Sequence, residues 1–181
     1  ELMGGRDAFI GKLDSLFTAD SKLEGESTSV DISGLIGQYA HGNEPSHHIA
    51  HLYNYVGQPW RTQEIVDEVL HTLYFNNPDG LSGNEDCGQM SAWYILNAMG
   101  FYQVCPGKPV YSIGRPLFNE ATVHLKDGKS FKVIAHNNSR DNKYVRSIVL
   151  NGNKLETPFF THQDIVDGGT LELTMGSEPL K

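Results

Sequence analysis

The chain has 181 residues, of which 39% are hydrophobic and 20% are charged, a composition typical of a globular protein with a buried core. Its net charge of -8 argues against a nucleic-acid partner, because phosphate binding needs clustered Lys and Arg and the 14 basic residues here are scattered. No stretch approaches the roughly 18 to 20 apolar residues of a membrane-spanning helix, so we expect no membrane span.

Residues 1 to about 104 show the periodicity and the end signals of helices. Apolar residues recur at three- and four-residue steps in two segments, which indicates amphipathic helices. They are Phe9, Ile10, Leu13, Leu16 and Phe17 in the first segment, and Ile65, Val66, Val69, Leu70, Leu73 and Tyr74 in the second. Prolines at 45 and 59 are typical of first helical residues, and glycines at 57 and 100 of helix ends. We predict helices near residues 5–17, 45–56, 59–75 and 88–99.

Two long, glycine-rich connections, residues 19–43 and 76–87, lead into acidic turns at the starts of predicted helices. Long loops in a compact protein usually carry function. Helix N-termini have unsatisfied N–H groups and a partial positive charge, so a carboxylate held there stays ionised and oriented. The turns 42–44 and 83–86 are therefore candidate walls of an active site.

The first acidic turn combines Glu44 with a group of histidines. Glu44 precedes a proline and is biased toward extended geometry, so its side chain should project from the rim of the site. His47 and His51 would share a helix face at the spacing of many zinc hydrolases, and with Glu44 they form a candidate zinc site. A packed histidine is nevertheless commoner than a ligand. His48, outside that spacing and near Glu44, favours hydrogen bonding to a polar substrate.

The second acidic turn contains two adjacent carboxylates, Glu85 and Asp86. They cannot both face one point unless the turn is irregular, so we expect one to cap the following helix, and Asp86 has a capping position. A functional interpretation is favoured by the existence of two acidic turns, because hydrolysis of a glycosidic bond needs two carboxyl groups with different duties.

The two cysteines are predicted to be free. Cys87 lies at the head of the helix near 88–99 and Cys105 beyond its end, so at ~1.5 Å per residue they are roughly 18 Å apart, too far for a disulfide. Cys87 could be a nucleophile at a helix N-terminus, but a small packed residue is the favoured interpretation.

Four aromatic residues lie near the acidic turns and could stack on sugar rings, although at helical spacing such residues more often belong to a core. They are Tyr53, Trp60, Trp93 and Tyr94.

Beyond a boundary near residues 106–109 the pattern alternates as in strands. Residues 122–125 and 130–133 flank an Asp-Gly turn and predict a hairpin. Further strands are expected at 144–150 and 170–175. The predicted fold class is therefore α+β, with a helical segment, 1–105, followed by a C-terminal β domain, 106–181, that forms a small antiparallel sheet or sandwich.

Several strings resemble the C-terminal part of glycoside hydrolase family 92. They are MGGRDAF with LDSLF, GNEPSHHIAHLYNY, GQPWRTQ, GLSGNEDCGQMSAWYILNAMGFY, PVYSIGRPLF and the closing Asn151-Gly152, which run in family order from about residue 3 to 180. Members of the family are calcium-dependent, exo-acting α-mannosidases that invert the anomeric centre, built from an N-terminal β-sandwich and an (α/α)6 barrel. The resemblance implies that residues 1–105 are the last helices of that barrel.

The resemblance also implies roles for residues of both acidic turns. Asp86 matches the general base that activates water, and Glu85 assists or orients it. The implied calcium ligands are Asn43 and Glu44. The implied substrate-binding residues are Glu44, His47 and His48. Calcium suits this chemistry, because a hard cation with oxygen ligands can grip adjacent sugar hydroxyls.

One departure from the family pattern concerns the general acid. In the family it lies on a Glu-Gly-Asn segment upstream of the Met-Gly-Gly block, where this chain begins. We therefore expect a fragment that needs the N-terminal part of the same protein and does not hydrolyse mannosides alone. A signal for secretion to the periplasm, cell surface or medium would lie upstream. The expected substrate is a terminal α-mannoside of a glycan, with an α-1,2 linkage.

Two other functions remain open at this stage. One is a carbohydrate-binding or structural module in which residues 106–181 bind glycans, and the other is the zinc hydrolase. The acidic turns and both tryptophans lie in the helical segment, which favours the mannosidase.

Overall fold

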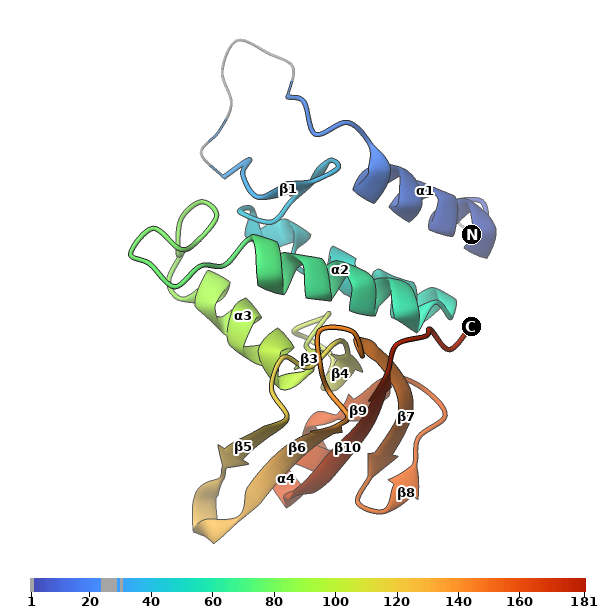
Figure 1. Cartoon of the computed structure of the whole chain (residues 1–181), viewed down its shortest axis with the longest axis vertical. Helices are drawn as coiled ribbons and strands as arrows, with labels where there is room; N and C mark the ends of the chain where they lie inside the picture. Colours follow the sequence, from blue (N-terminus) through green and yellow to red (C-terminus); the bar gives the residue numbers. More distant parts are fainter. Residues whose placement is uncertain (1, 24–28, 30) are drawn as a thin grey trace.

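The computed structural model describes residues 2–23, 29 and 31–181. Helices form one part of the molecule and the larger sheet lies beneath them (Figure 1). The elements of the helical part are α1 (Arg6–Thr18), β1 (Leu35–Ile36), β2 (Tyr39–Ala40), the 3-10 segments η1 (Glu44–Ser46) and η2 (Ile49–Val56), α2 (Pro59–Thr72) and α3 (Gln89–Met99). The remaining elements are β3 (Phe101–Tyr102), β4 (Val110–Ile113), β5 (Glu120–His124), η3 (Lys126–Gly128), β6 (Ser130–His136), β7 (Tyr144–Leu150), β8 (Asn153–Lys154), β9 (Phe159–Thr161), α4 (His162–Asp167) and β10 (Gly169–Gly176). The predicted α+β class is confirmed.

Three of the four predicted helices are α-helices, and the segment 45–56 is not. It consists of the 3-10 segments η1 and η2. The carbonyl of His47, which would accept from His51 N–H in an α-helix, instead accepts from Trp93 Nε1–H at 3.1 Å. The His51 N–H donates to the His48 carbonyl, which tightens the turn. None of the helices in the described part of the chain is long and apolar enough to cross a membrane.

The larger sheet has five strands in the order β5-β6-β10-β7-β8. The predicted hairpin is confirmed as β5 and β6, with Thr122 opposite Lys132. The sheet is mixed and not purely antiparallel, because β10 lies between β6 and β7 and runs parallel to β6, with Leu171 opposite Val133. The chain reaches that position through β8, β9 and α4, a connection long enough to bring β10 back in the direction of β6.

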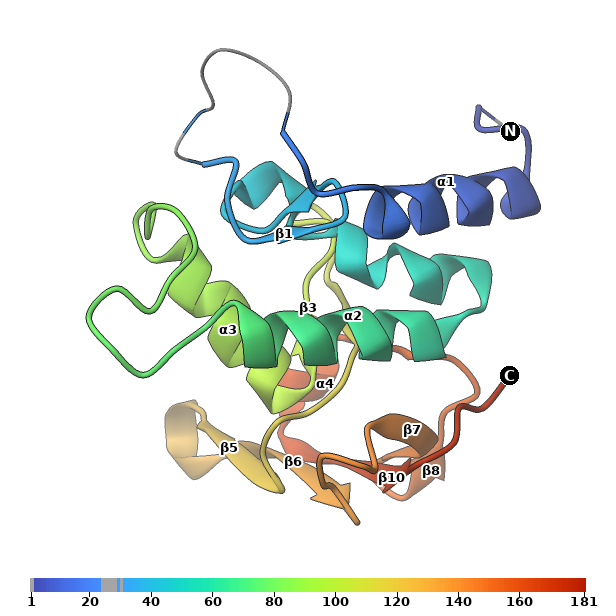
Figure 2. The ribbon, with the colours of Figure 1, turned by 45° about the horizontal axis from the view of Figure 1, so that its top comes forward.

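A smaller sheet has the strand order β3-β4-β9; β3 and β4 lie between α2 and the larger sheet in Figure 1, and Figure 2 shows β3 next to α2. The predicted boundary near 106–109 falls in the connection between β3 and β4, two strands that pair with each other. Polar contacts also join the two parts of the chain. The side chain of Asn54, in η2, donates to Ser112 Oγ and to the Ile113 carbonyl, at 2.6 and 2.8 Å.

Two groups of buried apolar side chains form the core. One lies among the helices and includes Tyr53 and Trp93, both 0% exposed, so these two aromatic residues belong to the core and cannot stack on a sugar. The other lies on the larger sheet and includes Phe131 and Leu171. Trp60 and Tyr94 are half-buried.

Candidate active site

The two acidic turns lie together although Glu44 and Asp86 come from separate loops. The backbone N–H of Glu44 favours its charged carboxylate and lowers its pKa. Burial, the neighbouring carboxyl group of Asp86 and the charge of Asp31 outweigh that effect, so the pKa of Glu44 is raised. Two carboxyl groups from other loops, those of Asp86 and Asp31, therefore act on Glu44.

Glu44 also carries an unpartnered oxygen. Among the described residues, its Oε1 atom is buried and has no hydrogen-bond partner. A buried carboxylate oxygen normally has a donor or a cation beside it. The oxygen donors available here, Glu44 and Asp86, are of the type that calcium prefers. Within residues 2–23, 29 and 31–181, however, no three His, Cys, Asp or Glu side chains converge as a metal site. The residues present thus fit part of a calcium shell, and the other oxygens would come from amide or main-chain groups, water, sugar or other segments.

The turn before α3 has an irregular backbone. Asp86, Cys87 and Gly88 follow one another with φ values of 48°, 57° and 89°, all in the left-handed region. For the two non-glycine residues this geometry costs about 1 to 2 kcal/mol each. The turn is tied to α3 by the Gln89 N–H, which donates to the Asp86 carbonyl at 3.2 Å. Because of this turn, the side chains of the adjacent residues Glu85 and Asp86 lie in different surroundings.

Glu85, and not Asp86, caps α3. The Glu85 carboxylate accepts from the backbone N–H of Ser91 at 3.0 Å and from its hydroxyl at 2.9 Å. The expectation that one of the two carboxylates caps the helix is therefore confirmed, although Asp86, which has a capping position in the sequence, is not that residue. The left-handed turn leaves the Asp86 side chain exposed, while the Glu85 side chain extends forward along the chain to the first turn of the helix.

Both cysteines are free, as predicted, but neither is packed. Cys87 and Cys105 are exposed. The expectation of a buried Cys87 is wrong because this residue lies in the left-handed turn outside α3 and not on the helix face that meets the core.

His47 is a core residue. It is 1% exposed, its Nε2–H donates to the His41 carbonyl at 3.0 Å, and its Nδ1 accepts from Gln89 Nε2–H at 3.1 Å. Its ring stacks on that of His41 with centroids 4.8 Å apart. Burial lowers the pKa of His47. The expectation that His47 contacts a sugar is corrected: its ring has no free, accessible donor, and only His48, which is half-buried, retains that prediction.

His51 occupies a second closed polar site. It is 0% exposed, and its two ring nitrogens lie 3.1 Å from Ser112 Oγ and 2.8 Å from Asn97 Oδ1. Burial lowers its pKa to about 4. Both ring nitrogens of His47 and both ring nitrogens of His51 are hydrogen-bonded, and the two rings have different partners. The two histidines therefore do not form a zinc pair.

Sequence reasoning missed four polar residues that support the acidic turns. Gln89 links His47 to the Tyr102 hydroxyl, and His41 lies between the hydroxyls of Tyr39 and Tyr74. Asp31 and Asn84 join two of the loops. The position of Asn84 in a Gly-Asn-Glu string that occurs twice is the signal that could have identified it.

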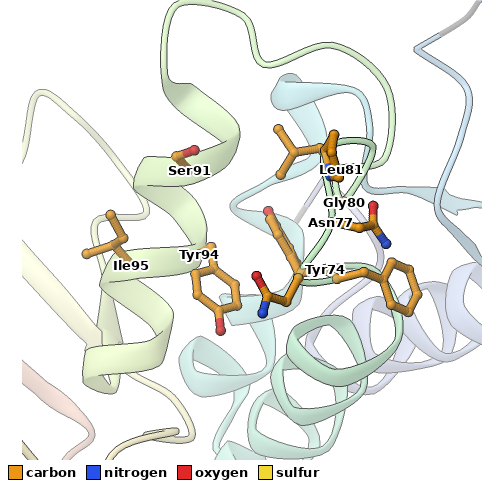
Figure 3. Close-up of a pocket in the computed structure, with 10 residues that line it drawn as sticks. Tyr74, Asn77, Gly80, Leu81, Ser91, Tyr94 and Ile95 are labelled. Atoms are coloured by element: carbon orange, nitrogen blue, oxygen red, sulfur yellow. The ribbon is translucent and has the colours of Figure 1, made fainter.

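A surface pocket of about 530 Å³ lies beside the site, between α3 and the loop that follows α2. Tyr74 and Tyr94 lie next to each other in its wall (Figure 3), with ring centroids 4.8 Å apart. Its lining residues are Tyr74, Phe75, Asn76, Asn77, Pro78, Gly80, Leu81, Ser91, Tyr94 and Ile95. None of them is a carboxylate, so this pocket can contribute contacts but not acid-base chemistry.

Comparison with known proteins connects this geometry with glycoside hydrolysis. Residues 1–177 match the model of the glycosyl hydrolase family 92 catalytic domain. An uncharacterized secreted glycosidase of Arthroderma benhamiae is 31% identical over 180 residues, which is 98% of this chain and 21% of the relative.

Solved structures give the same result. A family 92 α-mannosidase from Bacteroides thetaiotaomicron superposes with a TM-score of 0.88 at 44% identity, over 97% of this chain and 23% of that one. A family 92 inverting mannosidase from the same species superposes with a TM-score of 0.83 at 43% identity, over 98% of this chain and 25% of the other. The chain thus spans about a quarter or less of the relatives it matches. On this evidence the chain belongs to glycosyl hydrolase family 92.

Proposed function

We propose that the protein containing this chain is an exo-acting, inverting α-mannosidase that hydrolyses terminal α-mannosides, with α-1,2-linked glycans as the preferred substrates. The observation that carries the proposal is the meeting of Glu44 and Asp86 from two separate turns, one with an unpartnered buried oxygen and the other with an exposed side chain. The family supports glycosidase chemistry, and similar solved structures are named as mannosidases.

Asp86 acts as general base in this mechanism. Its carboxylate accepts a proton from a water molecule as the water oxygen forms a bond to the anomeric carbon. The bond from that carbon to the leaving oxygen breaks on the opposite face of the sugar, and the leaving oxygen takes its proton from a general acid. In the family pattern this acid lies on a Glu-Gly-Asn segment, and we expect the whole protein to supply it. The Glu85 carboxylate accepts two hydrogen bonds from Ser91, so it orients the turn and does not take the proton of the attacking water.

Glu44 and Asn43 would hold calcium and the mannose hydroxyls, and His48 would contact the sugar. The buried Oε1 of Glu44 supports this assignment because a cation beside it would satisfy an otherwise unpartnered atom. Calcium bound here would supply an oxygen-coordinated positive charge that grips two adjacent hydroxyls and favours a distorted ring. The other ligands of such an ion come from sugar, water or segments outside this chain.

The alternative functions have less support. The zinc hydrolase would need His47 and His51, whose ring nitrogens are already bonded. A separate carbohydrate-binding module in residues 106–181 is not favoured, because the catalytic-domain match continues through this part to residue 177. Since the chain spans about a quarter or less of the relatives it matches, we infer that it needs the rest of the protein for activity. The name of the secreted relative supports an extracellular location.

The test uses the full-length protein with α-1,2-mannobiose. Proton NMR of the first product should show β-mannose, as expected for inversion, and Asp86→Asn should lower kcat by about 10² to 10⁴ because the base is lost. Glu85→Gln is the matched control, since its amide oxygen still accepts from Ser91. An α-mannose product would exclude inversion, and full activity of Asp86→Asn would remove Asp86 from the mechanism.

A further inference from the structure

The turn that carries Asp86 is joined to a third loop by one long-range side-chain contact. Asn84 Nδ2–H donates to Asp31 Oδ1 at 3.1 Å, across 53 positions of sequence. The other carboxylate oxygen of Asp31 accepts from Ser29 Oγ–H at 3.2 Å. Asp31 is half-buried, whereas Asn84 is exposed. The contact, which we call the Asp31–Asn84 clasp, thus lies at the surface end of the turn.

The same loops approach closely at their main chains. A Cβ atom on Gly42 would lie 2.3 Å from Ser33 Oγ and 2.9 Å from the Ser82 carbonyl oxygen. The Gly42 N–H donates to the Ser33 carbonyl at 3.1 Å. The loop of Asp31, the loop of Glu44 and the loop of Asp86 therefore meet at a point where only a glycine fits.

The strained turn needs support on both sides. At its C-terminal side, Asp86 and Glu85 are tied to α3 through Gln89 and Ser91. At its N-terminal side, the clasp at Asn84 joins it to the loop of Asp31. Two consecutive non-glycine residues in the left-handed region persist only where the surroundings hold them. Without the clasp, the turn would keep its bonds to α3 and its main-chain packing near Gly42, but it would lose its side-chain bond to the loop of Asp31.

We propose that Asp31 is a positioning residue of the active site: through Asn84 it holds the Asp86 turn against the loop of Glu44. This inference rests on the proposed function, in which Asp86 is the general base. Asp31 itself need not touch the sugar. A displaced base lowers the rate of the chemical step more than it weakens substrate binding.

The kinetic test uses the full-length protein and α-mannosyl fluoride, whose leaving group depends little on the general acid. Asp31→Ala and Asn84→Ala should each lower kcat about 10- to 100-fold with KM changed less than about twofold. Asp31→Asn should recover most of the rate, because its amide oxygen can still accept from Asn84. The double variant should be no slower than either single variant, since both remove one contact.

Asp79→Ala is the matched control, because Asp79 is an exposed carboxylate in the same connection between α2 and α3. It should leave kcat unchanged. Circular dichroism establishes that each variant is folded. If Asp31→Ala does not fold, Asn84→Ala provides the same test at an exposed position.

Hydrogen exchange gives a second readout that needs no substrate. Amides of residues 84–91 should exchange faster in Asp31→Ala and Asn84→Ala than in the wild type, but not in Asp79→Ala. Unchanged exchange and unchanged kcat in folded variants would overturn the inference. Equal losses of kcat in Asp31→Asn and Asp31→Ala would also overturn it, because the loss would then come from the missing negative charge of Asp31 and not from the missing hydrogen bond. A wild-type protein that hydrolyses no α-mannoside would overturn the proposed function and the catalytic role of Asp31, while the exchange data would still decide whether the clasp orders the turn.

Discussion

The tripeptide Gly-Asn-Glu occurs twice, at 42–44 and at 83–85, and the two copies have different structures. In the first, Glu44 is itself the first residue of the 3-10 segment η1, and its Oε1 atom is buried without a partner among the described residues. In the second, α3 begins four residues after Glu85, and the Glu85 carboxylate accepts two hydrogen bonds from Ser91.

The difference follows from where each helix begins. Pro45 fixes the backbone directly after Glu44, so the helical segment starts at once and the carboxylate projects toward Asp86. After Glu85, the left-handed turn at 86–88 sets the helix start far enough along the chain for a glutamate side chain to reach the Ser91 N–H. The same three residues therefore supply a candidate ligand in one copy and a helix cap in the other, and Asp86 becomes the reactive acid of the second turn.

The largest expected effect separates the two glutamates directly. In the full-length protein, Glu44→Gln should lower kcat/KM about 10²- to 10³-fold, because an amide replaces a charged group at the sugar and the cation. Glu85→Gln should lower it less than about tenfold, since the amide oxygen can still cap α3. Isothermal titration should also show weaker calcium binding in Glu44→Gln alone. Equal losses in the two variants would mean that the copies do not differ in role.

The second effect concerns the packing that brings the copies together. Gly42→Ala should lower the free energy of unfolding by about 1 to 3 kcal/mol, because the new Cβ would overlap Ser33 Oγ and the Ser82 carbonyl. Gly107→Ala is the matched control, since within the described part of the chain no atom other than those of its sequence neighbours lies within 4 Å of a Cβ at that position. Denaturant unfolding of the full-length variants checks the difference. A Gly42→Ala protein as stable as Gly107→Ala would show that the loops do not meet at this glycine.

The elements that could be predicted are those set by near neighbours in sequence. Apolar periodicity indicated α1 and α2, and the alternation around an Asp-Gly turn indicated the hairpin β5–β6. The position of β10 between β6 and β7 could not be predicted, because strand order depends on contacts between distant segments.

The candidate site was predictable in its composition but not in its geometry. The strings around residues 42–48 and 83–93 predict which carboxylates belong to the site, but the sequence alone does not decide which of Glu85 and Asp86 caps the helix. That assignment depends on two non-glycine residues in the left-handed region, which no local propensity favours. His47 was misplaced because its carbonyl and ring are bonded to α3 residues more than 40 positions away.

A smaller effect tests the buried polar site behind the first turn. Burial lowers the pKa of His51 to about 4, below its value of 6.5 in the unfolded chain. Between these values the unfolded state binds more protons, so stability is fully present above pH 6.5 and is lost as the pH falls toward 4. The slope should approach about 1.4 kcal/mol per pH unit for one proton.

Unfolding of the full-length protein between pH 7 and pH 5 checks this expectation, with His51→Gln as the comparison. The variant should be less stable at pH 7 because the ring fills a buried site, but its stability should fall less steeply on acidification. Parallel pH profiles for the two proteins would mean that another group causes the acid sensitivity.

The smallest effect concerns the cap of the second copy. Ser91→Ala removes the hydroxyl that donates to Glu85 Oε2 but keeps the backbone N–H that donates to Oε1. The full-length variant should lose about 0.5 to 1.5 kcal/mol of stability, the net contribution of one hydrogen bond, and should keep its kcat within about twofold. A tenfold loss of kcat would show that Glu85 is coupled to the chemistry through Ser91. Both glutamates of the two Gly-Asn-Glu copies would then affect catalysis, Glu44 at the sugar and the cation and Glu85 through its bond to Ser91.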